Sequence, residues 1–235
     1  MNIVITGATS GIGLATARIL ALEGHRLLLL ARRTEKLALL KDEMGANVHV
    51  RTCDITDYEN VKEIASSIAA EWKSIDILIN NAGVGYFDTI EEGKIDEWHD
   101  MINTNVTGLL NVTHAFLPHL ISARGLVINV ASVAAHQVFA NSAIYCATKH
   151  AVFAVSEGLR IELAGKLRVS TISPGSVNTP FIENTSNEKM LSNYRDYFAA
   201  GLTPEIVAAQ INHALNAPNN SVISEIIVRP NRAMK

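Results

Sequence analysis

Short apolar runs alternate with longer amphipathic segments along the whole chain. The apolar runs are rich in Val, Ile and Leu and are bounded by polar or glycine-containing turns, a pattern typical of strands buried in a parallel sheet. Seven such strands are predicted, at residues 2–6, 26–31, 48–52, 75–79, 125–130, 168–173 and 222–228. Strands that alternate with helices predict an α/β fold, a single doubly wound (Rossmann) domain with a seven-stranded parallel sheet and helices on both faces.

The amphipathic segments between the strands predict helices with clear boundaries. Thr34 is expected to cap a helix that Gly45 ends, and Asp57 to cap a helix with an apolar face running to Trp72. A long helix is predicted over residues 96–120, and a local kink is expected within it because Asn103, Asn105 and Gly108 are poor helix formers. Further helices are predicted at residues 145–164 and 187–200.

The domain prediction is one unit over residues 1–235, without repeats or linkers. Residues 1–130 form its cofactor half and residues 131–235 its catalytic and substrate half. Within the second half, the polar, irregular stretch over residues 180–202 exceeds an ordinary connection and is interpreted as a lid.

Composition narrows the function classes. Apolar residues make up 48% of the chain, charged residues 18%, and the net charge is −3, so nothing favours nucleic-acid binding. No apolar run reaches the roughly 18 residues that a membrane span needs, and the N-terminal residues lack the pattern of an export signal. Cys53 and Cys146 are too few for a disulfide framework and lack a metal-ligand pattern, so a cytoplasmic protein without a metal site is expected.

A glycine-rich turn follows the first predicted strand directly. Gly7, Gly11 and Gly13 are spaced as G-x-x-x-G-x-G, ahead of a helical pattern that ends near Gly24. Glycines let the backbone approach a pyrophosphate closely, and the following helix N-terminus meets its negative charge. The order strand, glycine turn and helix therefore predicts a dinucleotide site.

The end of the second strand bears on the choice of dinucleotide. A protein that binds NAD usually places a carboxylate there, whereas this chain has Ala31 followed by Arg32 and Arg33. An arginine fork matches a phosphate dianion, so NADP (NADPH) is favoured and NAD is less likely. The alternative is that the two arginines only cap a solvated turn.

Candidate chemistry lies between Ser132 and Lys149. Ser132 ends the fifth apolar run, and Tyr145 and Lys149 stand four residues apart on one face of the next helix. A free tyrosine has a pKa of about 10, and a nearby cation favours its phenolate and lowers that pKa. The phenol is thus a candidate general acid or base. Taken alone, the Tyr–Lys pair also fits a solvated helix start, and Cys146 is interpreted as a small filler.

Six motifs in this order resemble the short-chain dehydrogenase/reductase family, in its compact single-domain branch, with a preference for NADP. The resemblance covers essentially the whole chain. The motifs are Thr6-Gly7-x-x-x-Gly11-x-Gly13, Asn80-Asn81-Ala82-Gly83, Asn105, Ser132, Tyr145-x-x-x-Lys149 and Pro174-Gly175.

The resemblance implies catalytic roles. Tyr145 is implied as the proton donor in carbonyl reduction, and Lys149 as the residue that lowers its pKa and bonds the nicotinamide ribose. Ser132 is implied to hold the substrate oxygen, and Asn105 to support a water that links Lys149 to solvent. The resemblance also implies a homodimer or homotetramer, formed through the helices around residues 96–120 and 144–164.

The cofactor site implied by the resemblance draws on most loops at one edge of the sheet. Asp54 is expected to face the adenine, and Val177 and Thr179 the nicotinamide carboxamide. Ser10 departs from relatives that carry a basic residue before the second glycine. The expected cofactor-binding residues are Gly7, Thr9, Ser10, Gly11, Ile12, Gly13, Arg32, Arg33, Asp54, Ile55, Asn81, Ala82, Gly83, Tyr145, Lys149, Pro174, Gly175, Val177 and Thr179.

A carbonyl compound or secondary alcohol is the expected substrate. Its binding residues are predicted to be Ser132, His136, Tyr145 and Phe181, with Tyr86, Val133, Gln137 and Phe139 also lining the pocket. The alternative for His136 is a loop histidine that only bonds solvent. A lid cation, Lys189 or Arg195, could pair with a substrate carboxylate. The Ala31-Arg32-Arg33 turn is similar to relatives that act on 3-hydroxy acids, which makes such acids a lead.

Two functions follow from these interpretations. The first is an NADP(H)-dependent oxidoreductase that moves a hydride between nicotinamide and a carbonyl or secondary alcohol, with Tyr145 as general acid/base. The alternative is a catalytically silent NADP-binding regulator or scaffold of the same fold. Turnover of NADPH with a panel of carbonyl compounds distinguishes the two.

Overall fold

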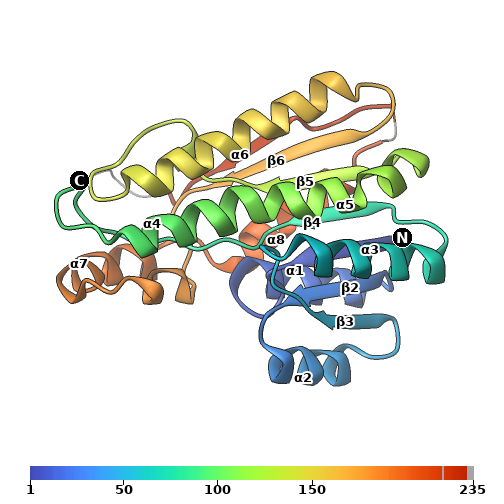
Figure 1. Ribbon diagram of the computed structural model, residues 1–235, viewed down its shortest axis with the longest axis horizontal. Helices are drawn as coiled ribbons and strands as arrows, with labels where there is room; N and C mark the ends of the chain where they lie inside the picture. The colour runs from blue at the N-terminus through green and yellow to red at the C-terminus, as the bar shows by residue number, and fades with distance from the viewer. Residues whose placement is uncertain (219, 232–235) are drawn as a thin grey trace.

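A computed structural model describes residues 1–218 and 220–231 (Figure 1). All seven predicted strands form, and they pair in parallel in the order β3-β2-β1-β4-β5-β6-β7. The strands are β1 (Asn2–Thr6), β2 (Arg26–Ala31), β3 (Val48–Thr52), β4 (Ile77–Asn80), β5 (Leu126–Val130), β6 (Arg168–Pro174) and β7 (Glu225–Val228). The predicted doubly wound parallel fold is confirmed.

Helices cover both faces of the sheet (Figure 1). They are α1 (Gly11–Leu22), α2 (Thr34–Met44), α3 (Tyr58–Trp72), α4 (Ile95–Ile102), α5 (Leu109–Ser122), α6 (Ala143–Glu162), α7 (Glu188–Ala199) and α8 (Pro204–Leu215). Short 3-10 turns lie at η2 (Val133–Ala135) and η3 (Pro180–Asn184), and a π-helical turn at η1 (Asn103–Gly108). None of the helices within the described residues has the length and apolarity to cross a bilayer.

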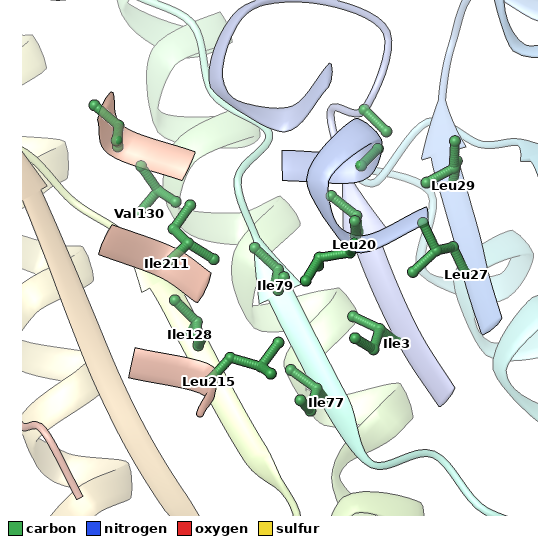
Figure 2. Packing of buried hydrophobic residues seen from close by; sticks show 14 of the residues in the cluster. Ile3, Leu20, Leu27, Leu29, Ile77, Ile79, Ile128, Val130, Ile211 and Leu215 are labelled. Atoms are coloured by element: carbon green, nitrogen blue, oxygen red, sulfur yellow. The ribbon is translucent and has the colours of Figure 1, made fainter. Parts of the chain in front are cut away.

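The core has two layers because successive strand residues point to opposite faces. On one face, Ile3 of β1 lies near Leu20 of α1, as Figure 2 shows. In the same cluster, Ile211 and Leu215 of α8 lie over Ile128 and its neighbours on β4 and β5. On the other face, a second cluster is built from the alternate positions of the strands and from α3, α5 and α6. The inner strands β1, β2, β4 and β5 are covered on both faces, which explains why their sequences are mostly apolar, whereas the edge strands β3 and β7 are partly exposed.

The predicted kink in the long helix is confirmed as the π-turn η1 between α4 and α5. One extra residue in this turn changes the direction in which side chains leave the helix. Asn105 is thereby turned inward and is buried.

Two cap predictions have different outcomes. Asp57 caps α3, since its carboxylate accepts a hydrogen bond from the Asn60 N–H at 3.1 Å. The prediction for Thr34 is wrong: α2 already begins at Thr34, and Arg33 occupies the N-cap position. The Thr34 hydroxyl instead pairs with that of Thr52 on β3 at 2.8 Å, so a contact between neighbouring segments replaces the local cap.

Candidate active site

A cavity of about 860 Å³ opens at the carboxyl ends of the strands. It is lined by the loops that follow strands β1 to β6, and by η3 and α7. The chain passes from β1 to β2 on one side and resumes with β4 on the other, so the loops diverge at this point of the sheet. Doubly wound folds bind ligands at such a switch point.

The glycine turn forms one wall of the cavity. Gly7 and Gly11 have φ values of 66° and 53°, which favour glycine, and α1 then points its N-terminus into the cavity. A Cβ on Gly7 would lie 2.8 Å from the Ala82 Cα. Gly13 does not line the cavity; a Cβ there would lie 2.5 Å from the Gly7 carbonyl oxygen. Its role is to let α1 pack closely against the turn.

The two arginines after β2 lie at the same end of the cavity. The Arg33 guanidinium donates hydrogen bonds to the Thr9 hydroxyl at 2.9 Å and to the Ser10 hydroxyl at 2.9 Å. Arg33 is therefore held over the glycine turn. Arg32 beside it is exposed and lines the cavity. The prediction of an arginine fork next to the dinucleotide turn agrees with this placement.

Asn81 joins the end of β4 to the end of β1. Its side-chain amide donates to the Thr6 carbonyl at 2.9 Å, and the backbone N–H groups of Asn81 and Ala82 both donate to the Thr6 hydroxyl at 3.0 Å. Asn81, Ala82 and Gly83 line the cavity. The remaining expected cofactor residues that line it are Thr9, Ser10, Ile12, Asp54, Ile55, Pro174, Gly175, Val177 and Thr179.

Ser132, Tyr145 and Lys149 come together at the other end of the cavity. Ser132 follows β5; its hydroxyl accepts from the Ala134 N–H at 3.1 Å and donates to the Pro174 carbonyl at 3.4 Å. Tyr145 and Lys149 lie one turn apart on α6, with the ammonium nitrogen 5.9 Å from the phenol ring centroid. The Lys149 Nζ donates to the Val130 carbonyl at 2.9 Å.

Burial governs the protonation of this group. It raises the pKa of Tyr145, because the phenolate loses its solvation, while the facing Ser132 hydroxyl lowers that pKa in part. Burial also lowers the pKa of Lys149 to about 8. The sequence-based expectation that Lys149 lowers the phenol pKa does not describe this state. The reason is that burial disfavours the phenolate, while the ammonium is directed at the Val130 carbonyl.

Asn105 lies behind the cavity and does not line it. Its amide nitrogen donates to the Val84 carbonyl at 2.8 Å and to the Thr148 hydroxyl at 3.0 Å, and its side-chain oxygen accepts from the Val84 N–H at 2.8 Å. The side chain thus ties the loop after β4 to α6, which carries Tyr145 and Lys149. Its support of a water beside Lys149 stays a prediction.

The structure corrects the placement of several predicted substrate residues. His136 does not line the cavity: its Nε2 lies 2.7 Å from a Glu225 carboxylate oxygen, and its ring packs edge-on against Phe153. The Tyr86 hydroxyl donates to Asp100 at 2.5 Å, away from the cavity. Gln137, Lys189 and Arg195 do not line the cavity either, whereas Val133, Phe139 and Phe181 do.

Four aromatic residues that the sequence analysis missed line the cavity near Tyr145. These are Phe87, Tyr194, Tyr197 and Phe198. Tyr194, Tyr197 and Phe198 are three and four residues apart on α7, so they share one face of the helix. This spacing is the sequence signal that identifies them. Within residues 1–218 and 220–231, no group of His, Cys, Asp or Glu side chains is arranged to hold a metal.

Comparisons with known proteins give a family, related sequences and related structures. A family model described as short chain dehydrogenase matches residues 1–190. An uncharacterized oxidoreductase of Staphylococcus saprophyticus is 38% identical over 97% of this chain and 95% of its own length. The serine 3-dehydrogenase of Rhizobium radiobacter is 37% identical over 97% of this chain and 93% of its own. A solved serine dehydrogenase in complex with NADP+ superposes with a TM-score of 0.91 at 33% identity, covering 98% of this chain and 95% of that one.

Proposed function

Because this chain belongs to the short-chain dehydrogenase family, we propose that it is an NADP-dependent oxidoreductase acting on a carbonyl compound or secondary alcohol. One observation carries the proposal. A single cavity holds the glycine turn and arginine pair at one end and Ser132, Tyr145 and Lys149 at the other. A dinucleotide bound along it would present its nicotinamide to the phenol.

The residues at the arginine end fit an NADP molecule. The absence of a Cβ at Gly7 lets the turn pack closely against Ala82, and the α1 N-terminus offers backbone N–H groups to a pyrophosphate. Arg33, held by Thr9 and Ser10, would pair with a 2′-phosphate, and Arg32 stands beside it. When bound, the nicotinamide supplies or accepts the hydride.

The other end of the cavity supplies orientation and the proton. The Ser132 hydroxyl would hold the substrate oxygen, and the Tyr145 hydroxyl would deliver a proton to that oxygen during reduction or remove one during oxidation. Lys149, anchored on the Val130 carbonyl, would bind the nicotinamide ribose and favour the phenolate when charged. Asn105 would fix α6 against the loop after β4.

The proposal is tested by mixing the protein with NADPH and a panel of aldehydes, ketones and 3-oxo acids while following NADPH absorbance. Turnover of at least one carbonyl compound supports the oxidoreductase. Tight NADPH binding with no turnover over a broad panel would instead indicate a silent regulator or scaffold.

The arginine pair gives a separate prediction about cofactor choice. Arg33→Ala is expected to raise the KM for NADPH by about tenfold relative to that for NADH, since a charge-assisted pair with the 2′-phosphate is lost. Arg32→Ala should act in the same direction. Lys36→Ala, an exposed change on α2 away from the cavity, serves as the control. An equal change for both dinucleotides in the arginine variants would show that the fork does not bind the phosphate.

We also propose that the protein is cytoplasmic and forms a homodimer or homotetramer. Ile95, Ile102 and Leu110 are exposed apolar residues on α4 and α5, within the segment predicted to form the interface. Light scattering coupled to gel filtration is expected to give twice or four times the 25.5 kDa chain mass. A monomer at micromolar concentration would contradict this proposal.

A further inference from the structure

The catalytic end of the cavity is walled by aromatic rings, here called the aromatic enclosure. They come from four separate parts of the chain: the loop after β4, the loop after η2, the turn η3, and α7. The enclosure consists of Phe87, Phe139, Phe181, Tyr194, Tyr197 and Phe198. α7 lies at the left end of the molecule in Figure 1, beyond the carboxyl ends of the strands.

The enclosure lies directly against the catalytic phenol. The Tyr145 ring centroid is 5.4 Å from that of Phe181 and 6.1 Å from that of Phe87. Phe87 in turn lies 5.1 Å from Tyr194 and 5.6 Å from Phe198, with tilted or edge-on rings. A carbonyl group that reaches the Tyr145 hydroxyl therefore places its substituent next to these rings.

Within the part of the chain that the structure describes, two of the three cationic side chains that line the cavity lie at its far end, and the third, Lys149, is held at the catalytic end by a backbone carbonyl. Among the described lining residues, the cationic side chains are Arg32, Arg33 and Lys149. The arginines lie beside the glycine turn, and Lys149 is anchored on the Val130 carbonyl. Near η3 the lining contributes Glu183, whose carboxylate repels anions.

A substrate carboxylate would thus leave water without gaining a cation in the enclosure. Burying an unpaired charge is strongly unfavourable, whereas an aromatic group buried among rings gains from the removal of apolar area and from edge-on packing. The lid cations considered in the sequence analysis, Lys189 and Arg195, do not line the cavity and offer no such pairing.

We propose that the substrate is a neutral carbonyl compound bearing an aromatic group, and that 3-hydroxy and 3-oxo acids are disfavoured. This inference rests on the proposed oxidoreductase function. In the reductive direction, the carbonyl carbon receives the hydride of NADPH and its oxygen receives the Tyr145 proton, which solvent replaces. The products are NADP+ and an aryl carbinol.

The test uses three related 3-oxo compounds with NADPH: ethyl 3-oxo-3-phenylpropanoate, the corresponding free acid, and ethyl acetoacetate. The neutral ethyl 3-oxo-3-phenylpropanoate is expected to have a kcat/KM about tenfold or more above that of ethyl acetoacetate, because its phenyl group is buried among the rings. Its kcat/KM should also be about tenfold above that of the corresponding free acid, because the acid buries a charge without a partner. A free acid that reacts as fast as its ester, or faster, overturns the inference.

Two variants locate the preference in the enclosure. The ratio of interest is kcat/KM for ethyl 3-oxo-3-phenylpropanoate divided by kcat/KM for ethyl acetoacetate. Phe198→Ala is expected to lower this ratio by about tenfold. Phe153→Ala is the matched control, since Phe153 packs against His136 outside the cavity, and it should leave the ratio unchanged. An unaltered ratio in Phe198→Ala contradicts the inference.

Calorimetric titration separates this inference from the proposed function. The NADP+-loaded protein is titrated with ethyl 3-hydroxy-3-phenylpropanoate and with its free acid, which is expected to bind at least about tenfold more weakly. If no carbonyl compound is reduced but the ester binds with this preference, the oxidoreductase proposal fails and the aromatic subsite stands. If the acid binds as well as the ester, the subsite inference fails whatever the turnover.

Discussion

Tyr145→Phe is expected to lower kcat/KM for carbonyl reduction by about 10³-fold, within the range for loss of a positioned acid or base. The ring stays, so its packing against Phe87 and Phe181 and the shape of the cavity are kept. Only the hydroxyl that faces Ser132 is removed. The variant should therefore bind NADPH as the wild type does, and stopped-flow absorbance with the fastest carbonyl of the panel measures the loss.

Tyr58→Phe is the matched control for that variant. The Tyr58 hydroxyl bonds to His114 at 2.8 Å on the surface between α3 and α5, away from the cavity. Removal of this hydroxyl should leave kcat/KM unchanged. If Tyr145→Phe retained activity comparable to this control, the proton would have to come from another group, and the assignment of Tyr145 would be wrong.

Most of the fold was predictable because the information is local. Strands buried on both faces show as continuous apolar runs, and the π-turn η1 falls where Asn103, Asn105 and Gly108 interrupt a helical pattern. The start of the last strand was not predictable from the apolar pattern. Val222 and Ile223 extend the apolar run, yet β7 begins only at Glu225. Strand length at a sheet edge is set by pairing with β6, which the sequence does not display.

The catalytic end shows the same division between local and tertiary information. Ser132, Tyr145 and Lys149 were identified because their spacing and the strand before them carry the signal. His136 was misplaced, since its partner Glu225 is 89 positions away and becomes adjacent only when β6 and β7 pair. The aromatic rings of α7 reach the cavity through the packing of α7 and η3 near Phe87, again a contact between distant segments.

Lys149→Met is expected to abolish most activity and yet stabilise the protein by about 2 kcal/mol at pH 7. Burial lowers the pKa of Lys149 from 10.5 to about 8, so at pH 7 the folded protein holds a charged group in a site that disfavours it. That difference corresponds to a cost of about 3 kcal/mol. Methionine removes the charge, while the lost hydrogen bond to the Val130 carbonyl offsets about 1 kcal/mol of the gain.

The pH dependence of the difference in unfolding free energy between Lys149→Met and the wild type distinguishes the charge explanation from a general packing effect. Between pH 8 and 10.5 the unfolded lysine still binds a proton that the folded lysine has released, so wild-type stability rises with pH through this window. The methionine variant lacks that rise, and the gap between the two should close as pH increases. Urea unfolding at pH 7 and pH 9.5 measures it, with Lys166→Met, an exposed change, as control. A gap that stayed constant between the two pH values would show that the buried ammonium is not its source. A gap that closes would show that the buried Lys149 ammonium destabilises the fold, at the position where the activity measurement tests its role beside Tyr145.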